Sequence, residues 1–166
     1  IFNTFESLKA EIQKNGLKIR VYLGNECIVD DKLVEDLQAG KAFTLNNTKY
    51  VLCEYPLYQV PCNFQSNIYD LMDKGYRPVI AHAERNAFID KNYGSIHELA
   101  ENGCLIQCNV GSYLNKYGPL ARKYAKMMLK HKKVSLFATD AHSIKKRSPE
   151  IYLRLYKKLK LRISKE

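Results

Sequence analysis

The sequence predicts an α/β fold in which parallel strands alternate with helices. Short apolar runs recur along the chain, and a stretch with helical spacing follows each of them. Successive runs end roughly 30 residues apart, which is the length of one strand, one helix and two loops in a parallel sheet. No linker or low-complexity segment interrupts the pattern, so we expect residues 1–166 to form a single domain.

The elements can be placed in order. A helix is expected over residues 3–16, because apolar side chains recur on one of its faces and an Asn-Gly pair ends it. The first strand is predicted over 19–23, shortly before Glu26, and a short helix then ends at Gly40. Further strands are predicted over 50–53, 78–81, 104–108 and 134–138, further helices over 63–75 and 95–102 and from Pro119 onward, and a loop over 110–114.

Most of the predicted strands lead to a side chain that can bind a metal ion. These side chains are Glu26, Glu54, His82, Asp140 and His142. Functional groups collect at the carboxyl ends of parallel strands, so neighbouring strands would bring these groups together. Asp140 and His142 are two residues apart, and alternation along an extended chain can turn both to one side. Asp-x-His alone is also typical of a turn with a capping aspartate.

The type of ligand indicates the metal. Carboxylate oxygens and imidazole nitrogens suit manganese, zinc or iron better than calcium. Arg85 follows His82 in the same predicted loop, as a phosphate site above a metal would require. Glu84 could neutralise Arg85 or begin the next helix. His97 and His131 lie in predicted helices, away from strand ends, and are expected at the surface.

Composition narrows the class of protein. The chain is 46% hydrophobic and 27% charged, as expected for a globular domain rather than a disordered one. It has no apolar run long enough to span a bilayer and no signal-peptide pattern, so we expect a cytoplasmic protein. The cysteines are odd in number, lack a Cys-x-x-Cys pair and are expected to be reduced and buried; they are Cys27, Cys53, Cys62, Cys104 and Cys108.

The net charge of +10 is concentrated towards the C-terminus. Residues 143–166 carry nine Lys or Arg against two Glu, and apolar residues between Tyr152 and Ile163 follow helical spacing. We interpret this segment as an amphipathic helix with a solvated basic face. Contact with anionic lipid or an acidic partner is the second interpretation, and no nucleic-acid motif accompanies the charge.

Four motifs together resemble a known group of enzymes. They are Gly24-Asn25-Glu26, Cys53-Glu54-Tyr55, Pro78-Val79-Ile80-Ala81-His82-Ala83-Glu84-Arg85 and Thr139-Asp140-Ala141-His142. They resemble the later motifs of the polymerase and histidinol phosphatase (PHP) superfamily, and most closely the metal-dependent protein tyrosine phosphatases of the CpsB/CapC type. The resemblance implies a distorted seven-stranded α/β barrel. This chain would form its C-terminal two thirds, because nothing in it matches the family's opening Asp-x-His-x-His motif.

The resemblance also implies a site with up to three metal ions, usually manganese, with iron and zinc as alternatives. Glu26 would be shared between metals, Glu54 and His82 would bind one metal, Asp140 another and His142 the third. Metal-activated water would attack the phosphorus of phosphotyrosine. Arg85 would hold the phosphate, and we also expect Asn109 to contact the substrate.

By the same resemblance, the substrate would be a phosphotyrosyl protein, namely a bacterial tyrosine kinase that regulates capsule or exopolysaccharide synthesis. Two alternatives stay open: another PHP phosphoesterase, such as a histidinol-phosphate phosphatase, or a catalytically incomplete binding module. An open partial barrel would expose a sheet edge, which favours association with a second copy.

Overall fold

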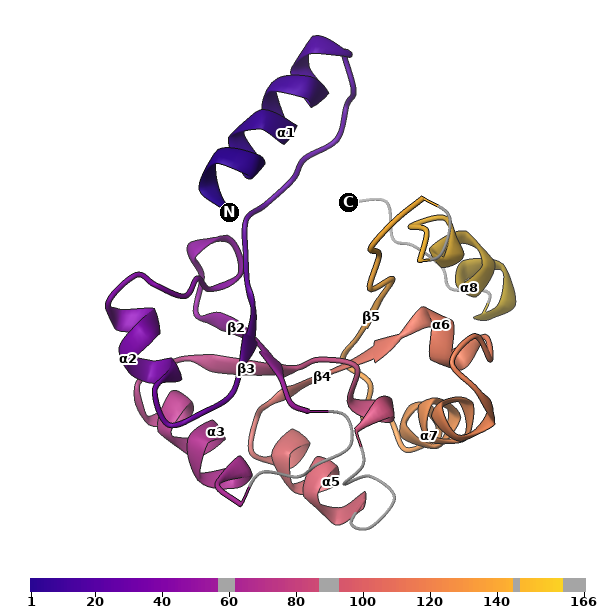
Figure 1. The fold of residues 1–166 in the computed structure, drawn as a ribbon. Helices are drawn as coiled ribbons and strands as arrows, with labels where there is room; N and C mark the ends of the chain where they lie inside the picture. The colour runs from indigo at the N-terminus through magenta and orange to yellow at the C-terminus, as the bar shows by residue number, and fades with distance from the viewer. Residues whose placement is uncertain (57–61, 87–92, 145–146, 160–166) are drawn as a thin grey trace.

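The computed structural model describes residues 1–56, 62–86, 93–144 and 147–159 (Figure 1). Its centre is a sheet of five strands in the order β1-β2-β3-β4-β5, and every neighbouring pair is parallel. The strands are β1 (Glu26–Ile28), β2 (Tyr50–Glu54), β3 (Arg77–Ile80), β4 (Leu105–Asn109) and β5 (Leu136–Ala138). The predicted α/β fold with parallel strands is confirmed.

Helices connect the strands and lie in an arc outside them, so that the sheet resembles part of a barrel (Figure 1). The α-helices are α1 (Phe2–Lys14), α2 (Leu33–Gln38), α3 (Phe64–Asp73), α5 (Tyr93–Glu101), α6 (Val110–Tyr113), α7 (Pro119–Lys130) and α8 (Ile151–Leu159). The described residues also form two short 3-10 helices, η1 (Leu45–Asn47) and η2 (Ala83–Arg85). None of the helices in the described ranges is long and apolar enough to cross a bilayer.

The core lies between the middle strands and the helices that cover them. Val51 and Cys53 of β2 and Ile80 of β3 are fully buried, and Ile68 and Leu71 of α3 belong to the same cluster. Strands buried on both faces read as continuous apolar runs, which explains why β3 and β4 were recognisable in the sequence. In β2, buried and half-buried residues alternate. The predicted burial of Cys27 and Cys53 is confirmed, but Cys62 is exposed, because it lies outside the strands.

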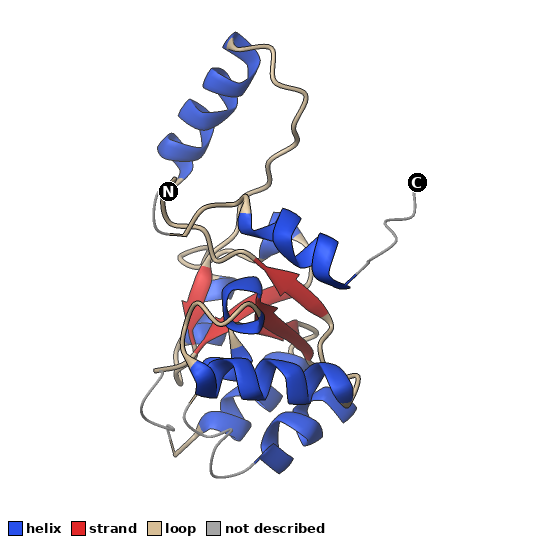
Figure 2. Cartoon of the chain, turned by 90° about the vertical axis from the view of Figure 1, so that its right-hand side faces the viewer, coloured by secondary structure: helices blue, strands red, loops and turns tan. Residues whose placement is uncertain are grey.

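The N-terminal part differs from the prediction. Residues 19–23 are not a strand, and β1 begins only at Glu26, where pairing with Leu52 starts. An apolar run needs a partner strand to complete its hydrogen bonds, and Ile19 is instead 57% exposed. The α1 helix stands away from the sheet (Figures 1 and 2), and its described contacts include an edge-on one between the rings of Phe2 and Phe43.

Two smaller expectations also need correction. Of the predicted loop 110–114, residues Val110–Tyr113 form the short helix α6, because this segment satisfies its backbone groups locally, as in the hydrogen bond from Leu114 N to Val110 O. In α8, Leu155 is buried, whereas Tyr152 and Tyr156 are exposed, so the apolar face is narrower than the sequence indicated. Residues 160–166 of the predicted last helix lie outside the described part.

Candidate metal and phosphate site

Three strands position three potential metal ligands at one edge of the sheet. Glu26 begins β1, Glu54 ends β2, and Ile28 pairs with Glu54 in parallel register. Because side chains alternate along a strand, this register turns Glu26 and Glu54 to the same face. His82 follows β3 at the start of η2, with a left-handed backbone conformation (φ 33°, ψ 46°).

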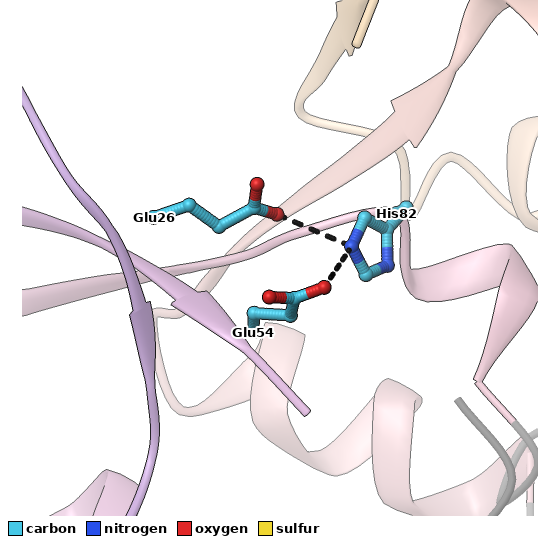
Figure 3. Close-up of side chains that lie close together, drawn as sticks. All are labelled: Glu26, Glu54 and His82. Carbon is cyan, nitrogen blue, oxygen red and sulfur yellow. Dashed lines mark hydrogen bonds and ion pairs between the residues drawn. The ribbon is translucent and has the colours of Figure 1, made fainter. Parts of the chain in front are cut away.

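The two carboxylates point at the same imidazole nitrogen (Figure 3). His82 Nε2 lies 3.2 Å from Glu26 Oε1 and 3.2 Å from Glu54 Oε1. His82 is buried, whereas the Glu26 and Glu54 side chains are 34% and 37% exposed, so the cluster is open on the carboxylate side. Their ligand atoms lie within 4.8 Å of one another. Two carboxylates and one imidazole form a donor set that fits a divalent manganese, iron or zinc ion.

The electrostatics of this cluster favour a bound cation. The hydrogen bond with His82 lowers the pKa of Glu26, outweighing the effect of burial. Burial alone would lower the pKa of His82, but the hydrogen bond to Glu26 and the charges of Glu26 and Glu54 outweigh it and raise that pKa. In the metal-free chain, a proton on His82 therefore partly neutralises the two carboxylates.

Asp140 and His142 form a second group beyond β5. Asp140 Oδ2 accepts hydrogen bonds from Asn109 Nδ2 at 3.0 Å and from Arg147 Nη1 at 2.9 Å. The His142 ring is 61% exposed, and its Nδ1 lies 2.8 Å from the backbone oxygen of Asp140. Among the described residues, Glu26, Glu54 and His82 form the only group of three whose ligand atoms all lie within 4.8 Å of one another, so Asp140 and His142 do not join that cluster. The metal-ligand roles of all five residues stay predictions.

Two arginines meet at Asp140. Arg85 Nη1 lies 3.6 Å from Asp140 Oδ2, beside the 2.9 Å contact from Arg147. Both guanidinium groups also lie over the ring of Tyr117. Arg85 was predicted from its place after His82, but Arg147 was not, because it stands in a basic run that resembles a solvated surface. In the sequence, Arg147 stands five residues after His142, and this short separation from a predicted metal ligand is the feature that could have pointed to it.

Glu84 lies in the first turn of η2, and its side chain is buried in the protein. Its Oε1 accepts hydrogen bonds from Ser112 Oγ at 2.5 Å and from Asn109 N at 3.2 Å. Burial raises the pKa of this carboxyl group. Glu84 thereby ties η2, which carries Arg85, to the end of β4. His97 of α5 and His131, which directly follows α7, are exposed, as predicted.

Comparison with known proteins identifies the family of this chain. The profile of the family described as "Capsular polysaccharide synthesis, CpsB/CapC" matches residues 1–164. The chain belongs to the CpsB/CapC family. This assignment confirms the resemblance drawn from the four sequence motifs.

The relatives of this family member include tyrosine phosphatases. Tyrosine-protein phosphatase YwqE of Bacillus subtilis is 32% identical over 143 residues, which are 86% of this chain and 56% of YwqE. A putative tyrosine-protein phosphatase, CapC of Staphylococcus aureus, is 33% identical over 153 residues, or 92% of this chain and 59% of CapC. The chain thus spans less than two thirds of the length of both relatives.

A solved structure confirms the fold. It belongs to a study of YwqE from Bacillus subtilis and CpsB from Streptococcus pneumoniae, described there as unique metal-dependent tyrosine phosphatases. The match has a TM-score of 0.82 and 32% identity, and covers 92% of this chain and 63% of that chain. The five parallel strands of this CpsB/CapC chain therefore correspond to part of the fold of a metal-dependent tyrosine phosphatase.

Proposed function

We propose that this chain belongs to a manganese-dependent protein tyrosine phosphatase and supplies part of its metal site and its phosphate site. The observation that carries the proposal is the meeting of Glu26, Glu54 and His82 at the carboxyl edge of a sheet whose next strands bring two arginines to Asp140. The metal-dependent tyrosine phosphatases that share this fold support it. The described strands form one continuous sheet, which supports treating residues 1–166 as one domain.

In this proposal, Glu26, Glu54 and His82 hold one metal ion, and Asp140 and His142 hold others. A bound manganese ion supplies Lewis acidity and lowers the pKa of a coordinated water. Arg85 and Arg147 bind the phosphate oxygens, since guanidinium groups present paired N–H donors to such oxygens. Asn109 helps to place Asp140 through its 3.0 Å hydrogen bond and lies near the substrate.

The substrate class follows from the relatives' names and from charge. We propose a phosphotyrosyl protein, namely a bacterial tyrosine kinase of a capsule-synthesis system. The net charge of +10 favours an anionic partner. The family description, which names capsular polysaccharide synthesis, supports the same setting.

Hydrolysis of a phosphotyrosyl peptide by the manganese-loaded protein that contains this chain tests the proposal. Glu26→Ala and Asp140→Ala are expected to abolish turnover, and Arg85→Lys to lower it about a hundredfold, because a point charge cannot replace the planar donor pair. His97→Ala is the matched histidine control and is expected to keep activity. Turnover of histidinol phosphate or another small phosphate ester, without turnover of the peptide, would replace this proposal with the small-molecule phosphoesterase alternative.

A further inference from the structure

An aromatic ring lies under both arginines of the proposed phosphate site. The Cζ atom of Arg85 is 4.8 Å from the ring centroid of Tyr117, and that of Arg147 is 5.6 Å from it. Arg85 comes from η2, Arg147 from the segment after Asp140, and Tyr117 from the connection between α6 and α7. Three separate parts of the chain therefore meet at this ring.

A glycine next to the Tyr117 ring provides the space that the ring occupies. Gly111 of α6 lies so close to Tyr117 that a Cβ added to the glycine would be 2.5 Å from ring atom Cε2 and 2.8 Å from Cζ. Real Cβ atoms do not approach other atoms so closely, because repulsion rises steeply below van der Waals contact. The place of the Tyr117 ring thus depends on a glycine at position 111.

The Tyr117 ring and the Asp140 carboxylate contact the two arginines in different ways. Asp140 accepts a hydrogen bond from Arg147 and forms an ion pair with Arg85 at 3.6 Å, and it is itself a proposed metal ligand. A cation over an aromatic face is attracted by the quadrupole of the ring. The face of the ring carries no oxygen acceptor, so this contact leaves the N–H donors of the guanidinium groups available for oxygen atoms. The ring also offsets part of the repulsion between two neighbouring cations.

We propose that Tyr117 is a positioning residue that orients Arg85 and Arg147 so that their N–H donors converge on one phosphoryl group. This inference rests on the proposed function and adds a residue to its phosphate subsite.

The first measurement is the affinity of the manganese-loaded protein for inorganic phosphate, by titration calorimetry, together with kcat and KM for a phosphotyrosyl peptide. Tyr117→Leu is expected to weaken phosphate binding and raise KM about tenfold, whereas Tyr117→Phe, which keeps the aromatic face, restores most of both. Gly111→Ala displaces the ring without removing it and is expected to change the same two quantities in the same direction. Circular dichroism confirms that each variant is folded.

A double-mutant cycle separates positioning from general stability. If Tyr117 acts through Arg147, Tyr117→Leu costs much less phosphate affinity in an Arg147→Ala background than alone. Tyr50→Leu is the matched control, because Arg77 lies over the Tyr50 ring at 5.9 Å, at the other end of β2 and β3. It is expected to leave phosphate affinity unchanged.

The outcomes distinguish this inference from the proposed function. Unchanged phosphate affinity and KM in Tyr117→Leu, or effects that simply multiply with Arg147→Ala, overturn the inference while peptide turnover still supports the function. Phosphate binding that depends on Tyr117, in a protein that does not hydrolyse phosphotyrosine, supports the inference and overturns the function. A protein that neither binds phosphate nor hydrolyses the peptide overturns both.

Discussion

His82 lies where two glutamates meet, and its protonation controls the charge of the cluster. Its Nε2 is 3.2 Å from both Glu26 Oε1 and Glu54 Oε1. The pKa of His82 is raised and that of Glu26 is lowered, because each ion stabilises the other. A metal ligand must be neutral imidazole, so a metal ion and a proton compete for the same nitrogen.

The first prediction is a pH dependence of stability in the metal-free chain. The contribution of Glu26 is present above its ordinary pKa of 4.5 and is lost as pH falls through the lowered folded value. The contribution of His82 is present below its ordinary pKa of 6.5 and is lost as pH rises through the raised folded value. We therefore expect the urea midpoint to fall as pH increases through neutrality. His82→Asn, which tolerates the left-handed backbone, should flatten this fall; an equally steep fall in that variant would contradict the assignment.

Asp140 supports a second prediction, because it binds two arginines and is also a proposed metal ligand. Asp140→Asn removes the charge but tolerates the φ of 51° at this position. In the metal-free chain, phosphate affinity should rise about three- to tenfold, because the arginines lose a competing carboxylate. In the protein that contains this chain, where Asp140 is a proposed metal ligand, manganese affinity should fall. Calorimetry with each ion measures both effects, and changes in the same direction would contradict the assigned role of Asp140.

At the scale of elements, η2 brings the metal and phosphate groups together. It begins directly after His82 and ends at Arg85, and buried Glu84 fixes it to the start of α6 through Ser112 and to β4 through Asn109. A 3-10 helix this short has little stability of its own. Its geometry therefore depends on that buried carboxyl group.

The third prediction concerns Glu84. Glu84→Ala leaves the Ser112 hydroxyl and the Asn109 N–H buried without an acceptor, and should cost about 3 to 5 kcal/mol of unfolding free energy. Glu84→Gln keeps an acceptor oxygen and should cost less than about 1.5 kcal/mol. Denaturant unfolding measures both. Equal losses in the two variants would mean that the volume of the side chain matters here and its hydrogen bonds do not.

The three middle strands and edge strand β5 could be predicted from the sequence, whereas edge strand β1 could not. Glu54 and His82 follow short apolar runs, and the structure places them together. Glu26 was found for an incorrect reason, since residues 19–23 are not a strand and Glu26 begins β1 instead of following it. Pairing partners decide where an edge strand lies, and the sequence of the strand alone does not contain them.

The arginine cluster shows a different limit of sequence analysis. Arg147 contacts Asp140 and Tyr117 contacts Arg147, and neither Arg147 nor Tyr117 belongs to a motif that the sequence displays. The inward orientation of Glu84 likewise depends on Ser112 of α6, in a segment that had been predicted as a loop. Spacing along a strand predicted which side chains share an edge, but side-chain packing decides which of them touch.

At the scale of the whole molecule, the sheet is open at β1 and β5, and α1 stands apart from it (Figures 1 and 2). The described part of the chain gathers one group of three metal ligands and leaves Asp140 and His142 beside arginines. Exposed strand edges favour pairing with another chain, so association with a second copy stays a prediction. The number of metal ions bound per chain therefore measures how many complete metal sites one chain contains.

The last prediction is therefore a metal stoichiometry. Elemental analysis of the 166-residue chain, purified without chelators and with manganese supplied, should give about one equivalent, held by Glu26, Glu54 and His82. At a hundredfold excess over Kd, this ion should raise Tm by about 5 to 10 °C, and EDTA should reverse the shift. Glu54→Gln should lose the ion and the shift, whereas His97→Ala should keep both.

Two or more equivalents would contradict a single complete site and would mean that Asp140 and His142 also bind metal, either within one chain or with ligands from a second copy. If the number of metal ions bound per chain falls as the protein is diluted, the extra ligands come from a second copy, because ligands supplied by another copy dissociate on dilution.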